Sequence, residues 1–395
     1  MKATTIFSLS SVLAITNAFV KRADSTNALS FENFGYPGSV LPVLEMKDIY
    51  SDSCTCSVAD PVQFNGATSP LDGEVSVHFR GPLVLHKFAA YTSGDYDAAG
   101  SGSGSWSRIA NFDDSVGNLE NVTFLTNAGR NSSCLGKGLT YAARDGVSAA
   151  ESSVPLGKNT LLTSNQEFAI FSNVSCGSSG LNNDCGVYRP EIPAYHGFYG
   201  RTKMFLFEFQ MPRDNSTSSE WVANLDMPAI WLLNANIPRT SQYSNNVNCS
   251  CWRSGCGEFD IFEVKNNTNS LVDRLLTTIH DYQGTGDIEM GLQVDGFIPR
   301  PEGTVRGGVS FDSKGNAVAW VSNSTSFDST ISGSDLKGWV KSSGSVITDE
   351  LASVSATPLS SKSSSKKSMG TNLTGESLFT KIWAMFVGIV LTNLF

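Results

Sequence analysis

The chain has 395 residues, with 37 acidic and 28 basic side chains and a formal net charge of -9. This acidic balance argues against nucleic acid as a partner, because binding to phosphates needs an excess of positive charge. The charged fraction is only 16%, and the 36 glycines, with recurrent short runs of aromatic and β-branched residues, predict an all-β protein.

The N-terminus has the pattern of a secretory signal peptide. Lys2 precedes an apolar stretch over residues 6–15, and small residues at 16–18 provide a cleavage site. Lys21 and Arg22 form a dibasic pair of the kind that secretory proteases cut. We therefore assign residues 1–22 to targeting and processing. The alternative is a buried N-terminal helix.

Residues 23–92 form a first, smaller β-rich block, with runs such as EVSVHFRG and LVLHKFAAY that predict strands. The pattern assigns this block no chemistry, and His78 and His86 fit packing or surface positions. Residues 93–107 are rich in Gly, Ser and Asp, a composition that cannot bury a core. They predict a flexible linker between two domains.

The larger domain is expected over residues 108–340. Strand-like runs recur there, separated by Gly, Asn or Pro: NVTFLTN, EFAIFSNV, KMFLFEFQMP, PAIWLLN, EFDIFEV, LLTTIHDY, GGVSFD and AVAWVSN. So many strands in one region predict a two-sheet sandwich. Ser, Lys, Thr and Ala then dominate residues 341–372, which predicts a disordered, O-glycosylated stalk.

The C-terminus ends in a second apolar segment, residues 382–395. It is short for a membrane span, which needs about 20 apolar residues. Small and polar residues at 370–375 precede it, and this order is typical of a glycosylphosphatidylinositol (GPI) attachment signal. Gly370 or Asn372 is the expected attachment residue, with 373–395 removed as a propeptide. A tail-anchored helix is the alternative.

The cysteines and glycosylation sequons fit a secreted protein. An even number of cysteines permits complete disulfide pairing, but the sequence leaves the pairing open. Zinc binding by Cys249, Cys251 and Cys256 is the weaker alternative. The eight cysteines are Cys54, Cys56, Cys134, Cys176, Cys185, Cys249, Cys251 and Cys256. N-glycosylation is expected at Asn121, Asn131, Asn173, Asn215, Asn248, Asn266 and Asn323, whereas the sequon at Asn372 competes with the anchor.

The stretch GEFDIFEV, residues 257–264, places three acidic residues close together. Side chains alternate along a strand, so Glu258 and Asp260 point to the same face, and one extra residue in a β-bulge would bring Glu263 beside them. Three like charges on one face weaken an ordinary sheet. They suit a retaining glycosidase, whose two carboxyl groups lie about 5–5.5 Å apart. The alternative is a solvated acidic strand edge.

Together with three further stretches, this motif resembles glycoside hydrolase family 16, whose signature is Glu-x-Asp-x-x-Glu after Gly. FYGRTKMFLFEFQMP, MPAIWLLN and TTIHDY follow the family's order, from residues 198, 227 and 277. The resemblance covers about residues 109–326 and is strongest between 198 and 280. The whole chain also resembles fungal GPI-anchored cell-wall proteins classed as glycosidases of this kind.

The resemblance implies a concanavalin A-like jelly-roll β-sandwich and a retaining mechanism. Glu258 would be the nucleophile and Glu263 the general acid and then base, with Asp260 between them. Trp231 is the candidate for stacking on a sugar, with core packing as the alternative, and His280 either contacts the substrate or packs. Met227 replaces a family Trp, and residues 234–256 have no counterpart in the family.

The expected function is a secreted, GPI-anchored retaining glycosidase or transglycosylase that acts on fungal cell-wall β-glucan. The resemblance implies β-1,3 linkages, because the signature with its extra residue resembles the bulged branch of the family that includes β-1,3-glucanases. Its partners would be the wall polysaccharide and the outer membrane leaflet, through the lipid, or the wall itself after transfer. No cofactor is expected, and no clear ligand cluster for Ca²⁺ is seen. The alternative is a non-catalytic wall glycoprotein that binds glucan or has a structural role.

Overall fold

The computed structural model describes residues 24–94, 96–97, 104–215, 221–283, 286–342 and 344–351. All of them belong to one compact unit, Met1–Ser361. The predicted signal peptide, the GPI-attachment region and most of the predicted stalk lie outside the described residues. Among the residues that are described, no helix is both long and apolar enough to cross a membrane.

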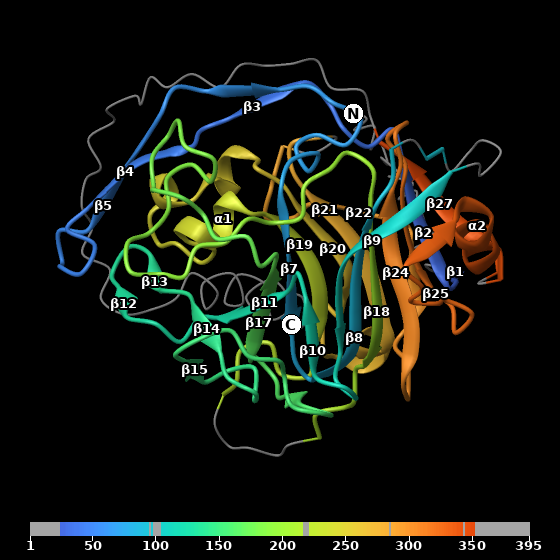
Figure 1. Cartoon of the computed structure of the whole chain (residues 1–395). Coiled ribbons are helices and arrows are strands. Elements are labelled where there is room, and N and C mark those ends of the chain that lie inside the picture. Colours follow the sequence, from blue (N-terminus) through green and yellow to red (C-terminus); the bar gives the residue numbers. More distant parts are fainter. Residues whose placement is uncertain are drawn as a thin grey trace, which may run out of the picture. The chain divides into compact units, whose positions relative to one another are not determined.

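Two large sheets carry the described part of the fold (Figure 1). Buried side chains from both sheets form one hydrophobic core. This confirms the prediction of an all-β sandwich, while the jelly-roll connection remains a prediction. All ten of the sequence runs named above as strand candidates contain strands. The repeated change between apolar runs and Gly, Asn or Pro was therefore a reliable signal.

The first sheet carries the acidic motif. Its strands, in spatial order, are β1 (Asp24–Ser25), β23 (Gly296–Pro299), β21 (Arg274–His280), β20 (Glu258–Glu263), β19 (Ala229–Asn234), β7 (Val75–Arg80), β17 (Glu167–Phe171), β11 (Thr123–Thr126), β14 (Thr140–Ala142) and β15 (Ala149–Ala150), with β22 (Leu292–Gln293) beside β21. Neighbours from β21 to β14 pair antiparallel.

The second sheet packs against the first across the shared hydrophobic core. Its order is β10 (Asn118–Glu120), β9 (Ser105–Asp113), β8 (Leu83–Thr92), β18 (Lys203–Gln210), β24 (Val305–Phe311), β25 (Ala317–Val321), β2 (Ala28–Glu32) and β27 (Val346–Glu350), with β16 (Leu161–Leu162) beside β8 and β26 (Thr330–Ser332) beside β9. Helix α2 (Gly333–Ser342) packs through Leu336 and Trp339 in a second hydrophobic cluster with Trp320 of this sheet.

Smaller elements complete the described chain. They are the strand pairs β3 (Gly38–Val40) with β6 (Val62–Phe64), β4 (Val43–Lys47) with β5 (Thr55–Val58) and β12 (Asn131–Ser132) with β13 (Gly136–Lys137), the helix α1 (Asn236–Thr240), and 3-10 turns at Val247–Cys249, Cys251–Ser254 and Asn269–Asp273.

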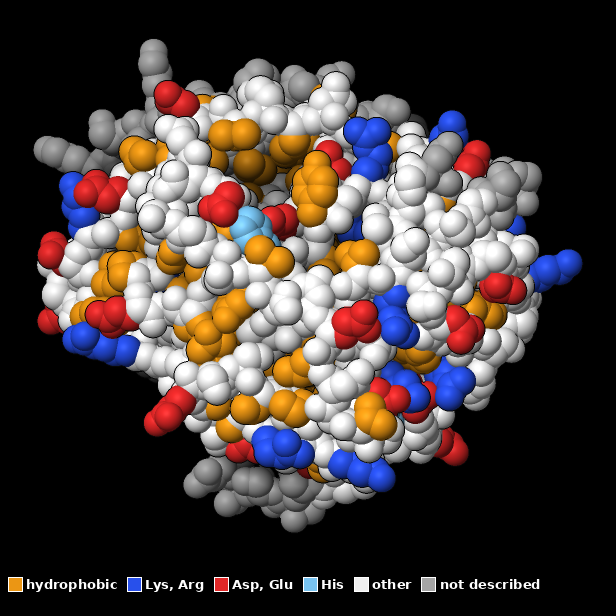
Figure 2. Space-filling view, in the orientation of Figure 1, with side chains coloured by type: hydrophobic (Ala, Val, Ile, Leu, Met, Phe, Trp, Pro, Cys, Tyr) orange, Lys and Arg blue, Asp and Glu red, His pale blue; other side chains and the backbone are white. Residues whose placement is uncertain are grey.

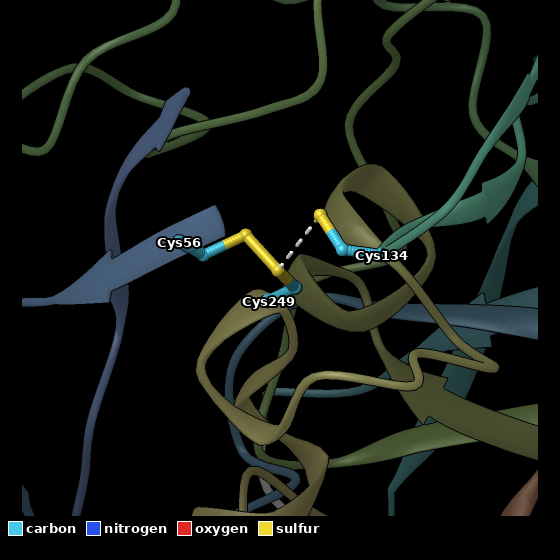
Figure 3. Close-up of side chains that lie close together, drawn as sticks. All are labelled: Cys56, Cys134 and Cys249. Carbon is cyan, nitrogen blue, oxygen red and sulfur yellow. Dashed lines mark hydrogen bonds between the residues drawn. A yellow bond between two sulfur atoms is a disulfide. The ribbon is translucent and has the colours of Figure 1, made fainter. Parts of the chain in front are cut away.

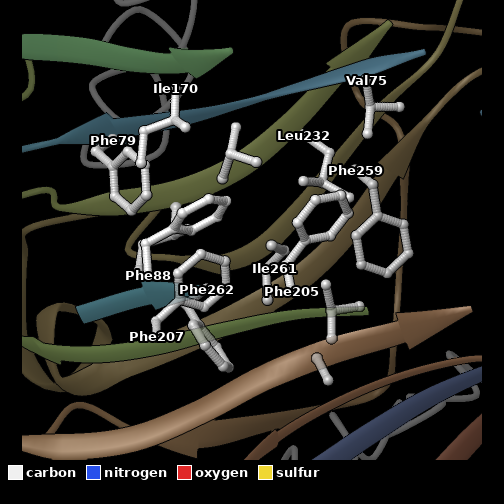
Figure 4. Close-up of a cluster of buried hydrophobic side chains, with 14 of the residues drawn as sticks. Val75, Phe79, Phe88, Ile170, Phe205, Phe207, Leu232, Phe259, Ile261 and Phe262 are labelled. Atoms are coloured by element: carbon white, nitrogen blue, oxygen red, sulfur yellow. The ribbon is translucent and has the colours of Figure 1, made fainter. Parts of the chain in front are cut away.

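Aromatic side chains fill the space between the sheets. Phe259 and Phe262 of β20 are fully buried, and Phe262 stacks on Phe209 of β18 with ring centroids 5.5 Å apart. Figure 4 shows Phe259 and Phe262 in the same cluster as Phe205 and Phe207 of β18. Burial of this face of β20 leaves the opposite face, with its carboxylates, outside the core.

The first β-rich block belongs to the same compact unit as the larger region, which differs from the predicted division into two domains. β2 pairs with β25 and β27, and β7 pairs with β17 and β19, so strands from the block sit inside both sheets. The predicted stalk also begins too early, because Val346–Glu350 forms β27. Local composition could not reveal these pairings, since each partner is more than 80 residues away.

The eight cysteines form four disulfides: Cys54–Cys134, Cys56–Cys249, Cys176–Cys185 and Cys251–Cys256. Two of them meet, because the sulfur of Cys134 lies 3.6 Å from that of Cys249 (Figure 3). The zinc alternative is therefore wrong for Cys249, Cys251 and Cys256. Two of the disulfides, Cys54–Cys134 and Cys56–Cys249, join the β4–β5 pair and its connecting loop to two distant segments of the chain.

The Phe31→Ala change tests whether the N-terminal block is part of the sandwich. Phe31 of β2 is fully buried and contacts the ring of Phe259 across the sheets, with centroids 6.0 Å apart. Loss of such a side chain costs about 3–5 kcal/mol. We expect one cooperative melting transition, shifted downward by roughly 6 °C or more.

The matched control is Val116→Ala, because Val116 is 71% exposed and should leave the melting temperature unchanged. Scanning calorimetry provides the readout. A separate transition that alone responds to Phe31→Ala would contradict a shared core.

Candidate active site

A β-bulge in β20 brings the three carboxylates to one face of the first sheet. Opposite β19, Phe262 pairs with Ile230 and Asp260 pairs with Trp231, so Ile261 is the extra residue. The register with β21 shifts at the same place. The bulge predicted from the spacing of Glu258, Asp260 and Glu263 is therefore confirmed.

The sheet register then arranges the site in three rows that cross the strands. The first row consists of Glu167, Arg80, Ala229 and Glu263. The second row consists of Ala169, His78, Trp231, Asp260 and Thr278. The third row consists of Ser76, Leu233, Glu258 and His280. Each row takes its members from neighbouring strands, and alternation along each strand keeps the rows on one face. β7, from the N-terminal block, contributes to all three.

All three carboxylates of β20 line one cavity of about 290 Å³. Its floor comes from β7, β19 and β20, and one wall comes from the chain between α1 and β20. The lining residues are Arg80, Ala229, Trp231, Gln242, Tyr243, Ser244, Val247, Ser250, Trp252, Arg253, Glu258, Asp260, Glu263 and Glu289. Across the rim, Arg253 forms an ion pair with Glu289 at 2.5 Å.

Trp252 and Arg80 hold the two glutamates. The indole N–H of Trp252 donates to Oε2 of Glu258. A guanidinium nitrogen of Arg80 lies 3.2 Å from Oε1 of Glu263, and Nε of the same arginine donates to the Met227 carbonyl at 2.8 Å. Met227 therefore acts here through its backbone carbonyl, a contact that does not depend on its side chain.

Asp260 is linked to His280. Nε2 of His280 lies 3.1 Å from Oδ2 of Asp260, and Nδ1 lies 2.6 Å from the Ile288 carbonyl. Both side chains are buried, with Asp260 only 4% exposed. The carbonyl fixes Nδ1 as a donor, so Nε2 can donate to Asp260 only when the imidazole is protonated.

The electrostatics of the cluster favour proton retention. Burial raises the pKa of Glu258 to about 8, and the charge of Asp260 adds to this effect. Burial and Asp260 also raise the pKa of Glu263 to about 7, against the opposing charge of Arg80. Burial lowers the pKa of His280, but its hydrogen bond to Asp260 and the nearby carboxylates outweigh this and raise it to about 9. Glu258 and Glu263 therefore hold a proton near neutral pH beside a charged imidazole.

Two polar atoms of the cavity residues are buried without a hydrogen-bond partner among the described residues. They are Oε2 of Glu263 and Nε1 of Trp231. Buried polar groups are rarely left unsatisfied, and exceptions often mark a site that a ligand completes. The Glu263 oxygen can carry a proton or accept a hydrogen bond, whereas the Trp231 nitrogen can only donate one.

Trp231 lies in the site, but its ring is not open. It is 3% exposed, and His78 covers one face with ring centroids 5.3 Å apart. Burial lowers the pKa of His78 to about 3, so this imidazole stays neutral and packs. Of the two predicted roles for Trp231, the ring has the packing role. Only the indole N–H, which has no hydrogen-bond partner among the described residues, could still contact a sugar.

Sequence reasoning missed Arg80 and the cavity wall that includes Tyr243 and Trp252. Arg80 ends a run, EVSVHFRG, that was predicted as a strand without chemistry. The wall lies in the segment 234–256, for which the sequence resemblance offered no counterpart. Its three cysteines and its aromatic residues were the available signals that it is an ordered part of the site.

The described residues hold no clear metal site. Two groups have metal-like spacing, Cys56 with Cys134 and Cys249, and Cys176 with Cys185 and His196. Every cysteine in both groups is in a disulfide and therefore lacks the thiolate that binds metals.

Six of the seven predicted N-glycosylation sites are exposed. They are Asn131, Asn173, Asn215, Asn248, Asn266 and Asn323. Asn121 is partly buried, and its side-chain nitrogen donates to the Ile109 carbonyl at 2.9 Å. Glycosylation at all seven remains a prediction, as does attachment of an anchor at Gly370 or Asn372, which lie outside the described residues.

Comparison with known proteins gives two matching family models and several curated relatives. The models are "Cell wall protein YJL171C/Tos1, N-terminal" over residues 27–93 and "Cell wall protein YJL171C/Tos1, C-terminal" over residues 104–339. No solved structure matches the chain significantly.

Two relatives are similar over nearly their whole length. A Candida albicans protein named "Probable circularly permuted 1,3-beta-glucanase PGA52" is 58% identical over 365 residues, or 91% of this chain and 94% of the relative. The Saccharomyces cerevisiae "Probable circularly permuted 1,3-beta-glucanase YJL171C" is 46% identical over 355 residues, or 89% and 88%. These matches show that the chain belongs to the YJL171C/Tos1 family of cell wall proteins.

Proposed function

We propose that this protein is a retaining glycosidase or transglycosylase that acts on β-1,3-glucan of the fungal cell wall. The observation that carries the proposal is the bulge in β20, which gathers Glu258, Asp260 and Glu263 in one cavity. The unpartnered oxygen of Glu263 supports it, and so do the relatives' names, which read "Probable circularly permuted 1,3-beta-glucanase".

In the first step, a carboxylate oxygen of Glu258 attacks the anomeric carbon and forms an ester, while the glycosidic C–O bond breaks. Glu263 gives its proton to the departing oxygen. The indole N–H of Trp252 fixes the direction of Glu258. The free oxygen of Glu263 is the atom that would carry the transferred proton, because its other oxygen is held by Arg80.

In the second step, water or a sugar hydroxyl attacks the same carbon and the ester bond to Glu258 breaks. Glu263 takes the proton of the attacking group and returns to its starting state. Asp260, held by His280, lies between the glutamates and supplies negative charge that opposes the ionisation of both. This keeps a proton on the pair of glutamates near neutral pH, and the reaction requires that proton to lie on Glu263 while Glu258 is ionised.

We also propose that the protein is secreted and carries a GPI anchor at Gly370 or Asn372. The signal-like N-terminus, the C-terminal apolar segment and membership of a cell wall family support this location. The lipid would hold the protein at the outer face of the plasma membrane, from which the protein could be transferred to the wall.

The Glu258→Gln change tests the reaction. We expect the rate on fluorescent laminari-oligosaccharides, measured by separating products by length, to fall by about 10³-fold or more, because the nucleophile is lost. Shorter products indicate hydrolysis and longer ones transfer. Asn323→Gln is the control, since Asn323 is exposed and lies outside the cavity.

Unchanged turnover in Glu258→Gln would refute the assignment of the nucleophile. Tight binding of glucan by the unaltered chain, with no product from β-1,3, mixed-linkage or chitin substrates, would instead support a wall protein that only binds.

The same variant should alter the dependence of stability on pH. A carboxyl whose folded pKa is raised stabilises the fold below its unfolded pKa, and this contribution is lost as pH rises through the folded value. For Glu258 the window runs from about 4.5 to about 8. We expect Glu258→Gln to match the unaltered chain at pH 4 and to melt about 2 °C or more above it at pH 8.

Fluorimetric melting at pH 4 and pH 8 measures this effect, with Glu45→Gln as the control because Glu45 is an exposed glutamate outside the cavity. Equal shifts in the two variants, or a loss of stability at pH 8 in Glu258→Gln, would show that the buried charge is not the cause.

A further inference from the structure

Tyr243 presents an open ring to the active-site cavity while its hydroxyl is fixed. The residue is 57% exposed and lines the cavity, yet its hydroxyl lies 2.9 and 3.0 Å from the two carboxylate oxygens of Glu167. A tyrosine with a packing role buries its ring and leaves its hydroxyl near water. Here the polar end is held and the apolar ring is left free.

The backbone around Tyr243 is held from both sides. The hydroxyl of Ser241 donates to the Leu135 carbonyl at 2.7 Å, and that of Ser244 donates to the Cys134 carbonyl at 2.8 Å. Cys134 belongs to the pair of adjoining disulfides that also includes Cys249, further along the same cavity wall (Figure 3). An exposed aromatic side chain so constrained loses little entropy when a ligand packs on it.

The position of Tyr243 relative to the carboxylates follows from the sheet register. Glu167, which holds the tyrosine, shares a cross-strand row with Arg80, Ala229 and Glu263. Ala229 carries only a methyl group, so Arg80 reaches Glu263 across it. Tyr243 therefore lies at one end of this row, next to Glu167 of β17, and Glu263 of β20 lies at the other end.

A second cavity differs from the active-site cavity in its polar groups. Figure 2 shows a hollow on one face of the molecule, edged by hydrophobic side chains, with acidic groups and a histidine nearby. The second cavity, of about 630 Å³, includes the exposed Tyr199, but the carboxylate of Glu74 in its lining is already paired with His196 and Arg239. Among the described residues that line that cavity, no buried side-chain polar atom lacks a hydrogen-bond partner, whereas the cavity of Tyr243 has two such atoms.

We propose that Tyr243 is the platform of a sugar-binding subsite on the leaving-group side of the site, which takes a glucopyranose unit of β-1,3-glucan against its ring. The side follows from the proposed function, because Glu263 protonates the departing oxygen and Tyr243 stands along its row. Pyranose rings have an apolar face that suits an aromatic surface.

The same subsite serves the second step. After the leaving group departs, it holds the sugar whose hydroxyl oxygen bonds to the anomeric carbon, while the ester bond to Glu258 breaks and the proton passes to Glu263. A filled platform therefore favours transfer to sugar over transfer to water, since it raises the local concentration of the sugar hydroxyl.

Binding is tested in the full chain carrying Glu258→Gln, by calorimetric titration with laminarihexaose. Adding Tyr243→Ala should weaken the affinity by about tenfold, as loss of an aromatic contact does in other interfaces. Tyr243→Phe keeps the ring and should stay within about threefold. Tyr199→Ala removes an exposed tyrosine from the other cavity and should have no effect.

Transfer is tested in the chain with Glu258 intact. Tyr243→Ala should lower the ratio of longer to shorter products by about fivefold or more, corresponding to about 1 kcal/mol, and Tyr199→Ala should leave the ratio unchanged. Melting temperatures of all variants show whether each is folded.

Equal affinity and product ratio in Tyr243→Ala and the unaltered chain would overturn the subsite, while turnover that still depends on Glu258 would leave the proposed function intact. Loss of affinity in Tyr243→Phe equal to that in Tyr243→Ala would also overturn it, because the hydroxyl and not the ring would then be responsible. Absence of any glucan binding or turnover in the unaltered chain would overturn both.

Discussion

The site depends on the cost of keeping three carboxylates together out of water. Burial and mutual repulsion raise the pKa of Glu258 and of Glu263, and the neighbouring groups offset part of that cost. Arg80 pairs with Glu263, Trp252 donates to Glu258, and His280 pairs with Asp260. Without these partners, burial of the ionised carboxylates would cost so much free energy that the strand would move into solvent or the carboxyl groups would remain protonated. The arrangement therefore keeps part of the cluster ionised and part of it protonated. A nucleophile must be an ionised carboxylate, and a general acid must be a protonated carboxyl group.

The fold provides this arrangement through a single irregularity. β20 buries Phe259, Ile261 and Phe262, and the bulge at Ile261 returns Glu263 to the face of Glu258 and Asp260. Partners then come from either side of β20 in the sheet: Arg80 from β7 and His280 from β21. The disulfide-linked segment before β20 adds the wall with Trp252 and Tyr243. The N-terminal block supplies both a strand of the active-site sheet and half of a disulfide that holds the wall.

Much of this could be predicted from the sequence, and the reasons for the failures are physical. Alternation and the spacing of Glu258, Asp260 and Glu263 were enough to predict their shared face and the bulge, because both are properties of one strand. Arg80 could not be predicted, since its pairing with Glu263 depends on a sheet contact between residues 183 positions apart. The same limit hid β27 and the joining of the N-terminal block to both sheets. Trp231 was identified as a site residue, but sequence alone could not show that His78 would cover its ring.

The most direct test of the account is chemical labelling of the nucleophile. The full chain would be incubated with a 2-deoxy-2-fluoro-β-laminaribiosyl fluoride, which forms a slowly hydrolysed ester with a retaining enzyme, and the labelled peptide would be sequenced by mass spectrometry. The account predicts one adduct, on Glu258, with none in the Glu258→Gln chain. An adduct on another residue, or turnover of laminari-oligosaccharides without any adduct, would contradict it.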